Sequence, residues 1–495
     1  MATGINWTGT YSADSKLGTA NDDTLSGLAG NDSLNGGGGN DSIDGGSGTD
    51  TLLGGTGNDT LDAGEGSGTP ESLDGGDGND IIRVSGDNTL DLIAPFGGLG
   101  SDTVSVMAGR NAYLLSFAPS NSIETWQGNG RVVYGTGGNN ALDFSATTMV
   151  GAGVIDADFG NDTVIGSAGA DSLFGNYGND SLNGGGGNDL LDGGSGTDTL
   201  LGGTGNDTLD AGEGSGTPES LDGGDGNDII RVSGDNTLDL IAPFGGLGSD
   251  TVSVMAGRNA YLLSFAPSNS IETWQGNGRV VYGTGGNNAL DFSATTMVGA
   301  GVIDADFGND TVIGSAGADS LFGNYGNDSL NGGGGNDTLV GGSGNDTFVA
   351  KPGMAADQIN DFTRGSDKID VSPFGLSWSQ LQPKITASGT NSIIDFGSGS
   401  KITLMGVAPG SLTATDFVLS SGPTQPATLS IAAASADSAN KLEGNSGSTP
   451  FTFTVTRTGN TAVATTADWA VSANQSPDAT AADFVGGSFP RGQVT

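Results

Sequence analysis

The chain contains neither cysteine nor histidine among its 495 residues. Without histidine it cannot build an HExxH zinc site, a His-containing catalytic triad or an imidazole general base. Without cysteine it has no disulfide, no cysteine-ligated zinc and no thiol nucleophile. A pair of carboxylates of the glycosidase kind is therefore the main catalytic route left open.

Basic residues and long apolar runs are also scarce. Lys and Arg number 15 against 57 Asp and Glu, which gives a formal net charge of -42. Nucleic acid and anionic lipid are poor partners for such a polyanion. No run of about 18 apolar residues exists, so membrane insertion is not expected. The first 16 residues lack a basic segment followed by an apolar core, so no N-terminal secretory signal is expected.

A nine-residue repeat is the main positive feature of the sequence. From position 27 the chain reads GLAGNDSLN, GGGGNDSID, GGSGTDTLL and GGTGNDTLD. Each block places an aspartate at its sixth position and an aliphatic residue at its eighth. An acidic chain with 93 glycines and 6% aromatic residues could instead be disordered. Disorder would not require an aliphatic residue in strict period, so the repeat predicts an ordered solenoid.

The repeat also predicts how the solenoid binds ions. The glycine-rich half of a block forms a tight turn, and the last three residues form a short strand with its aliphatic side chain inward. Two blocks complete one coil, and parallel strands of adjacent coils lie about 4.8 Å apart. Aspartates and turn carbonyls of stacked turns then converge on one hard cation, calcium rather than magnesium. The alternative, Asn-Asp pairs that only form hydrogen-bonded turns, leaves the aligned aspartates repelling one another.

The blocks GGSGTDTLL, GGTGNDTLD and GGSGNDTFV resemble the RTX (repeats-in-toxin) signature GGxGxDxUx, and the resemblance spans about 18–349 with interruptions. It implies an all-β parallel β-roll that is unfolded until it binds several calcium ions. The calcium ligands that it implies are Asp23, Asp32, Asp41, Asp50, Asp59, Asp162, Asp171, Asp180, Asp189, Asp198, Asp207, Asp310, Asp319, Asp328, Asp337 and Asp346. Isolated copies at Asp80, Asp102, Asp228 and Asp250 are expected to lack a stacked neighbour and are left out of that set.

A longer duplication overlies the short repeat. Residues 30–177 and 178–325 are two copies of one 148-residue unit, which differ only where Ser42-Ile43 becomes Leu190-Leu191. Regular arrays are expected near 18–62, 157–210 and 305–349, after an N-terminal lead-in at 1–17, with less regular solenoid between them. The apolar residues of that irregular stretch, such as Phe117 and Trp126, are expected to be core rather than a ligand platform.

The composition changes after the third array. Residues 350–421 are expected to form a β-rich cap, and 422–427 a linker. The segment 357–417 resembles the one that follows RTX arrays in serralysin-type proteases. From residue 428 the chain resembles the start of a Calx-β domain, a calcium-binding β-sandwich that would be truncated at residue 495. That resemblance places Glu443 and Asp483 near calcium loops.

Together these features predict a non-enzymatic, calcium-stabilised extracellular repeat protein. The resemblance implies export by type I secretion, folding on calcium outside the cell, and an adhesion-type role at the cell surface or in a matrix. The alternative is a stabilising and secretion module of a larger secreted lyase, epimerase, glycosidase or toxin whose catalytic part is absent.

Overall fold

The computed structural model describes residues 3–420, apart from gaps at 63, 67–70, 85–87, 93–97, 152, 211, 215–218, 233–236, 240–244, 256 and 299–300, together with four strands beyond residue 427. The chain divides into two compact units. The first comprises Met1–Ile369 and Ile385–Asp416, and the second Asp370–Lys384 and Phe417–Thr495.

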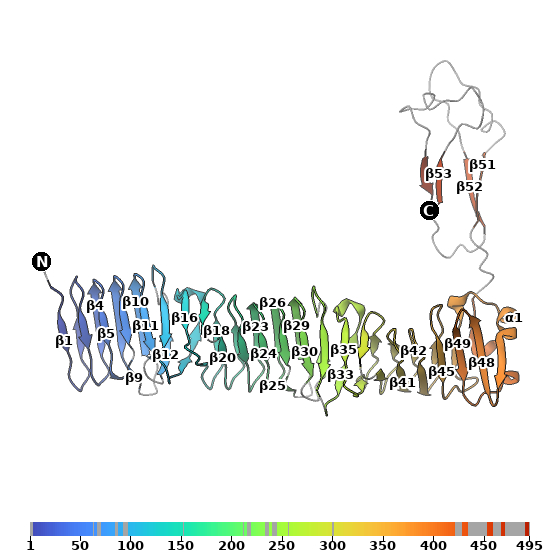
Figure 1. Ribbon diagram of the computed structural model, residues 1–495, viewed down its shortest axis with the longest axis horizontal. Helices are drawn as coiled ribbons and strands as arrows, with labels where there is room; N and C mark the ends of the chain where they lie inside the picture. Colours follow the sequence, from blue (N-terminus) through green and yellow to red (C-terminus); the bar gives the residue numbers. More distant parts are fainter. Residues whose placement is uncertain are drawn as a thin grey trace, which may run out of the picture. The chain divides into compact units, whose positions relative to one another are not determined.

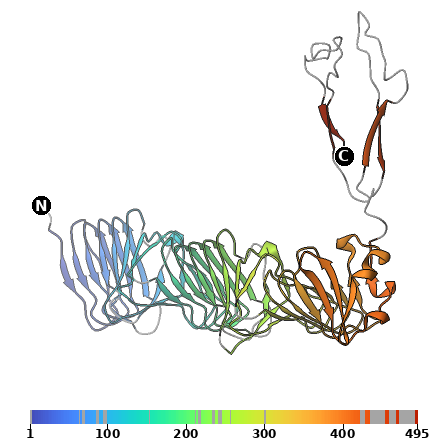
Figure 2. The ribbon, with the colours of Figure 1, turned by 45° about the vertical axis from the view of Figure 1, so that its right-hand side comes forward.

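The first unit is a parallel β-solenoid, which confirms the predicted fold class. Its coils stack along one axis, as Figure 1 and Figure 2 show. Strands one coil apart pair in parallel and in strict register, for example β3 with β5 through Leu25 and Ile43. The 18-residue coil deduced from two nine-residue blocks is therefore the structural unit of the regular arrays.

Among the residues that the structure describes, four sheets, of 8, 15, 16 and 7 strands, form the walls of the coils. One runs through β1 (Asn6–Thr8), β3 (Thr24–Ser26), β5 (Ser42–Asp44), β8 (Thr60–Asp62), β11 (Ile81–Val84), β13 (Thr103–Val106), β16 (Thr125–Gln127) and β19 (Thr148–Val150).

The second long sheet runs through β2 (Ser15–Leu17), β4 (Ser33–Gly38), β7 (Thr51–Thr56), β10 (Glu71–Asp77), β12 (Asn88–Leu92), β14 (Ala112–Leu114), β17 (Val133–Tyr134), β20 (Val154–Asp156), β22 (Ser172–Phe174), β24 (Leu190–Asp192), β27 (Thr208–Asp210), β30 (Ile229–Val232), β32 (Thr251–Val254), β35 (Thr273–Gln275) and β38 (Thr296–Val298).

The third begins with β15 (Ser116–Phe117), β18 (Ala141–Asp143), β21 (Thr163–Ile165), β23 (Ser181–Gly186), β26 (Thr199–Thr204), β29 (Glu219–Asp225), β31 (Thr237–Asp239), β33 (Ala260–Leu262), β36 (Val281–Tyr282), β39 (Val302–Asp304), β41 (Ser320–Tyr325) and β43 (Thr338–Ser343). The fourth includes β34 (Ser264–Phe265), β37 (Ala289–Asp291), β40 (Thr311–Ile313), β42 (Ser329–Asn331) and β44 (Thr347–Val349).

The core is a column of inward side chains, one from each strand. Leu25, Leu34, Ile43, Leu52 and Leu61 are all between 0% and 1% exposed. The strands that carry these five residues are only three to six residues long, so a single inward residue carries most of the apolar burial of its block. This explains why the eighth position of the repeat is always aliphatic or aromatic.

In the less regular coils, an aromatic cluster replaces part of the aliphatic column. Phe117, Trp126 and Phe144 are at most 2% exposed, and the Phe117 and Phe144 rings stack with centroids 4.4 Å apart. Trp126 packs edge-on against both. The expectation that Phe117 and Trp126 are core is thus confirmed. Tyr113 and Tyr134, by contrast, are only partly buried and stack on each other.

After the third array the first unit changes from parallel to antiparallel pairing. Strand β45 (Ala356–Ile359) stacks on β43, and β49 (Ser400–Leu404) stacks on β45, both in parallel. Two antiparallel strands then follow at the edge, β48 (Asn391–Gly397) and β47 (Ile385–Ser388). These antiparallel strands lie at the edge of the sheet that contains β43, within the residues 350–421 that were expected to form a cap.

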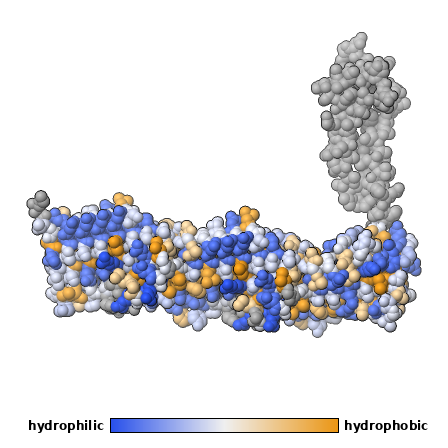
Figure 3. Space-filling view, viewed as in Figure 1, coloured by the Kyte–Doolittle hydropathy of each residue, from blue (hydrophilic) through white to orange (hydrophobic). Residues whose placement is uncertain are grey.

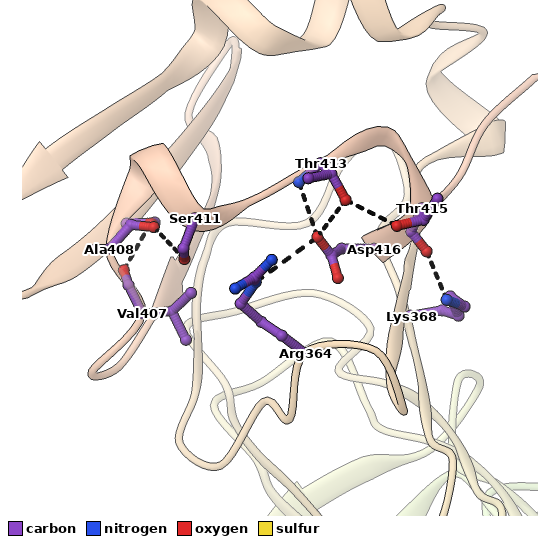
Figure 4. Close-up of polar contacts among 9 residues, drawn as sticks. Arg364, Lys368, Val407, Ala408, Ser411, Thr413, Thr415 and Asp416 are labelled. Atoms are coloured by element: carbon purple, nitrogen blue, oxygen red, sulfur yellow. Dashed lines mark hydrogen bonds and ion pairs between the residues drawn. The ribbon is translucent and has the colours of Figure 1, made fainter.

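A polar cluster holds the last segment of this unit (Figure 4). The carboxylate of buried Asp416 accepts hydrogen bonds from the Thr413 amide at 2.8 Å and the Thr413 hydroxyl at 3.0 Å. Arg364 lies 3.9 Å from the same carboxylate, and the Lys368 ammonium donates to the Thr415 carbonyl. Three short 3-10 or strand elements surround the cluster: β46 (Lys368–Asp370), η5 (Pro409–Ser411) and η6 (Ala414–Asp416).

The second unit contains a short helical segment and two strand pairs. Its helices are η3 (Ser372–Phe374), α1 (Trp378–Leu381) and η4 (Gln382–Lys384). Strand β51 (Thr428–Ala433) pairs antiparallel with β52 (Phe453–Thr458), and β53 (Ala467–Ala470) with β54 (Arg491–Val494). Glu443 and Asp483, expected near calcium loops, lie outside the described residues. In the described part of the chain, no helix is long and apolar enough to cross a membrane.

Candidate metal sites

The predicted ligand aspartates share one environment. All 16 are between 1% and 3% exposed, although ionised carboxylates are rarely buried without a partner. Each lies at the end of a glycine-rich turn, two residues before an inward core side chain. Asp189 and Leu191 illustrate the spacing, with Leu191 0% exposed. The strand therefore anchors the acid: burying the eighth residue fixes the sixth on the inside of the turn.

Hydrogen bonds align these acids into ladders. The amide of Asp41 donates to Oδ1 of Asp59 at 2.7 Å, and the amide of Asp189 donates to Oδ1 of Asp207 at 2.8 Å. The described residues form six such ladders, in which each amide donates to the side chain one coil further on: Asp14, Asp32, Asp50 and Glu71; Asp23, Asp41, Asp59, Asp80, Asp102 and Glu124; Asn140, Asp162, Asp180, Asp198 and Glu219; Asp171, Asp189, Asp207, Asp228, Asp250 and Glu272; Asn288, Asp310, Asp328, Asp346 and Asp367; Asp319, Asp337 and Asp357.

Almost all the predicted ligands have one carboxylate oxygen without a hydrogen-bond partner. Of the 16 aspartates, 15 have a buried oxygen that makes no hydrogen bond. Asp23 is the exception, because it accepts from the Ile5 amide and from both the amide and hydroxyl of Thr19. A buried anionic oxygen without a donor is costly, so the chemistry of these atoms fits a positively charged ligand.

Glycine makes room for that ligand at the first position of each block. A Cβ on Gly36 would lie under 3.0 Å from Oδ2 of Asp41 and from the carbonyl oxygen of Gly54. The same pair of oxygens, one from the block and one from the next coil, meets Gly184 and Gly323. The partnerless carboxylate oxygen and a stacked turn carbonyl therefore face one small space. Carboxylate and carbonyl oxygens without nitrogen or sulfur are the donor set of a hard cation.

No large acidic cluster contributes to these spaces. Among the described residues, no group of three or more His, Cys, Asp or Glu side chains converges on one point. A metal at any turn would thus be held by few carboxylates, with backbone carbonyls completing its shell. Such mixed ligation suits calcium, which accepts six to eight oxygens in flexible geometry, better than magnesium.

The electrostatics of the ladders also favour a bound cation, because the ladder acids are buried close to one another. Burial, together with the charges of Asp207 and Asp171, raises the pKa of Asp189 to about 7. Burial and neighbouring acids likewise raise the pKa of Asp41 to about 6. Within the described ranges, no basic side chain forms an ion pair with any acid of the six ladders. At Asp23, burial opposes the hydrogen bonds from Ile5 and Thr19, and the pKa is lowered overall.

A comparison with protein families matches three segments of the chain, 17–67, 156–230 and 298–348, to the RTX calcium-binding nonapeptide repeat. The chain carries RTX calcium-binding nonapeptide repeats. These repeats bind calcium, several ions across the arrays, so the calcium expected from the sequence is confirmed.

Two solved structures are similar to parts of the chain. One is the extracellular lipase LipA from Serratia marcescens, with 19% identity over 54% of this chain and 41% of the lipase, at a TM-score of 0.19. The other is the AlgE6R3 subunit of the mannuronan C5-epimerase from Azotobacter vinelandii, with 23% identity over 36% of this chain and 91% of the subunit, at a TM-score of 0.19. This chain thus spans less than half of the lipase. No curated protein matches the sequence.

The RTX ladders extend further than the sequence predicted. Asp80, Asp102, Asp228 and Asp250 were expected to lack stacked neighbours, and that expectation is wrong. The amide of Asp59 donates to Asp80 at 2.7 Å, and that of Asp80 to Asp102 at 2.7 Å. All four are 1% exposed and keep one partnerless oxygen. These acids lie 21 or 22 residues after the preceding acid of the ladder rather than 18. The stacking could therefore not be recognised from a fixed nine-residue period.

Sequence reasoning also missed acids that stand in for the RTX aspartate. Glu71 and Glu219 occupy ladder positions within the segments 63–74 and 211–222, which interrupt the nine-residue repeat. Asp357 and Asp367 occupy ladder positions after the third array. The signal that would have found them is an acid two residues before a buried apolar residue, as in Glu71 and Leu73. The nine-residue period is not needed for this spacing.

Blocks that depart from the RTX pattern compensate locally. In GSAGADSLF, serine replaces the second glycine, and the Ser167 hydroxyl donates to Asp171 at 2.8 Å. The other oxygen of Asp171 stays partnerless. In GNYGNDSLN, Asn176 takes the second position with a φ of 69°, a left-handed conformation that asparagine tolerates. Neither departure removes the free carboxylate oxygen.

A second ladder lies outside the metal spaces. The Asn58 amide donates to the Asn40 side chain at 2.7 Å, and the Asn79 amide to Asn58 at 2.8 Å. These turn residues are exposed, and Figure 3 shows hydrophilic residues gathered in bands along the solenoid. Where an asparagine precedes the RTX aspartate, as at Asn40 and Asn58, it therefore joins neighbouring turns without calcium.

Proposed function

We propose that this protein is a calcium-stabilised structural repeat protein that works outside the cell. The observation that carries the proposal is the stack of buried carboxylates, each with one oxygen that has no partner, beside a turn carbonyl of the next coil. Filling those spaces with calcium turns a repelling column of acids into a column of bridges between coils. The bound ions and the apolar column then hold the same coils together.

The proposed ligands are the 15 predicted aspartates with a partnerless oxygen, together with Asp80, Asp102, Asp228 and Asp250. Asp23 is left out, because hydrogen bonds occupy both of its carboxylate oxygens. It lies in the first coils, where Ile5 closes the ladder from the N-terminal side. Its role there is to end the stack rather than to bind an ion.

Coupling of folding to calcium fits export in an unfolded state. The acidic chain repels itself while calcium is scarce, as in the cytosol, and folds where calcium is abundant, outside the cell. This is the behaviour of a type I secretion substrate. A surface or matrix adhesion role would use the folded solenoid as a stiff spacer, and any Calx-β-like domain from residue 428 would add to it.

The second candidate is a stabilising and secretion module of a larger secreted lyase, epimerase, glycosidase or toxin. In this case the acids would still be calcium ligands, and catalysis would reside in another part of the same gene product. The reading frame on both sides of this sequence distinguishes the two candidates. A separate domain of catalytic composition there favours the module, and further adhesion-type repeats favour the structural protein.

Calcium titration of the full chain, followed by circular dichroism, tests the proposal. We expect a disordered spectrum in excess chelator and a β spectrum once millimolar calcium is added, while magnesium at the same concentration does not substitute. A chain that already gives the β spectrum in excess chelator rules out folding coupled to export. An equal response to magnesium rules out sites shaped for calcium.

A further inference from the structure

Two glutamates close ladders where an insertion interrupts the RTX repeat. The inserted segment AGEGSGTPESLD occupies 63–74 in the first 148-residue copy and 211–222 in the second. Glu71 and Glu219 lie at the same place in it, and both are 0% exposed. Neither lies in a block that matches the RTX signature, since the residues around each glutamate read GSGTPESLD. Each lies 21 residues after the preceding aspartate of its ladder, Asp50 or Asp198. A fully buried glutamate at the same place in both copies is not explained by packing alone.

Each glutamate accepts the ladder hydrogen bond that an aspartate accepts elsewhere. The Asp50 amide donates to Oε2 of Glu71 at 2.6 Å, and the Asp198 amide to Oε2 of Glu219 at 2.5 Å. Between regular coils the same bond measures 2.7 Å from Asp41 to Asp59. Asp80, which also lies 21 residues after the acid before it, accepts the same bond at 2.7 Å, so the two glutamates take the place of ladder aspartates.

The other oxygen of each glutamate is free and enclosed. Oε1 of Glu71 and Oε1 of Glu219 are buried without a hydrogen-bond partner, and so are Oδ2 of Asp50 and Oδ2 of Asp198. In the described part of the chain no basic group pairs with any of these acids. Glu124, which ends another ladder, is only partly buried and has no such oxygen. The enclosed, partnerless oxygen thus separates Glu71 and Glu219 from a glutamate that merely accepts a hydrogen bond.

We infer that Glu71 and Glu219 are calcium ligands, and that each completes a site with the aspartate one coil before it. The inference rests on the proposed function, because it extends the calcium ladder beyond the RTX blocks. Asp50 and Asp198 would otherwise face a coil with no carboxylate. The glutamates let each ladder keep its last ion where the coil widens.

The double variant Glu71→Gln/Glu219→Gln tests this inference in the full chain. Glutamine is isosteric and its carbonyl can still accept the Asp50 or Asp198 amide, but it removes the charge. Native mass spectrometry in calcium, checked by equilibrium dialysis, should show two fewer tightly bound ions than the parent. The single variants should each lose one ion. They also keep the test readable if the double variant does not fold.

The matched control is Asp77→Asn/Asp225→Asn, which removes the same charge from exposed positions on the same strands. It should keep the parental number of ions. A glutamine variant that also keeps the parental number overturns the inference and identifies Glu71 and Glu219 as neutral buried acids. A parent chain that binds no calcium at all overturns the proposed function instead, so the two failures are distinguishable.

Discussion

At the residue scale, each position that recurs among the RTX blocks of this chain has its own structural role. The sixth position supplies a carboxylate whose one oxygen aligns the coils and whose other oxygen faces the metal space. The eighth position supplies the buried side chain that fixes the acid in place. The first glycine leaves the metal space open, and the fourth, such as Gly187 with a φ of 116°, takes a backbone conformation that other residues resist.

Filling the metal space tests the task of the first glycine. A methyl group at Gly184 would lie under 3.0 Å from Oδ2 of Asp189 and from the Gly202 carbonyl. We expect Gly184→Ala to destabilise the calcium-bound solenoid by about 1–3 kcal/mol, the usual cost of overpacking. Urea unfolding in saturating calcium measures this change. Gly137→Ala is the control, because a Cβ there has nothing within 4 Å; equal loss in both variants contradicts a metal space at Gly184.

At the element scale, the array of coils is the unit that binds calcium, and its ladders have ends. The ladder through Asp189 ends at Glu272. The next two ladders along the chain begin at Asn288 and at Asp319. Between them the aromatic cluster of Phe265, Trp274 and Phe292 fills the core. Carboxylate ladders are thus separated by coils that depend on apolar packing, which predicts that arrays fold as separate modules.

Neutralising two consecutive aspartates of one ladder tests whether the arrays fold as separate modules. Asp189 and Asp207 are consecutive in one ladder, joined by a 2.8 Å hydrogen bond. We expect Asp189→Asn/Asp207→Asn to lose calcium and amide protection in the second array, while residues 305–349 stay protected. Hydrogen exchange with mass spectrometry resolves the two regions. Loss of protection along the whole chain would contradict separate modules.

The sequence predicts the regular arrays almost residue by residue, because one period fixes turn, strand, core residue and acid together. Leu34, Ile43 and the acids two places before them lie where the repeat puts them. The prediction fails where a coil gains residues. Asp102 and Glu71 lie 22 and 21 residues after the preceding acids of their ladders, so the count changes while the ladder hydrogen bond is kept. Spacing within a strand survives insertion, whereas spacing between turns does not.

At the scale of the whole molecule, the net charge of -42 and the buried carboxylates both destabilise the folded state. Charge repulsion opposes the folded state, and desolvation opposes it further, because the ladder acids are buried. Two kinds of cation relieve both effects, namely calcium and the proton. Both bind the ionised carboxylate, so calcium and the proton compete at each acid of a ladder.

This competition gives the chain without calcium a distinctive dependence on pH. Burial, with repulsion from neighbouring acids, raises the pKa of Asp41 and Asp180 to about 6 and those of Asp189 and Asp337 to about 7, from 3.8. These pKa values are higher in the folded state than in the unfolded state. The folded state therefore binds more protons than the unfolded state between pH 3.8 and about pH 7. Stability from protonation is fully present below about pH 3.8 and is lost as the pH rises through 6 to 7.

In excess chelator we therefore expect β structure to increase as the pH falls from 8 towards 5, above the isoelectric point of about 4.1. In saturating calcium the same change of pH should instead release ions, because a protonated carboxylate is a poor ligand. Circular dichroism and calcium-electrode measurements on one sample series follow both effects. The matched control is Asp41→Asn/Asp189→Asn, which removes two titrating rungs and should weaken the pH response in chelator. A chain that unfolds further as the pH falls in chelator would show that its ladders are stabilised as anions, and that something other than calcium neutralises them.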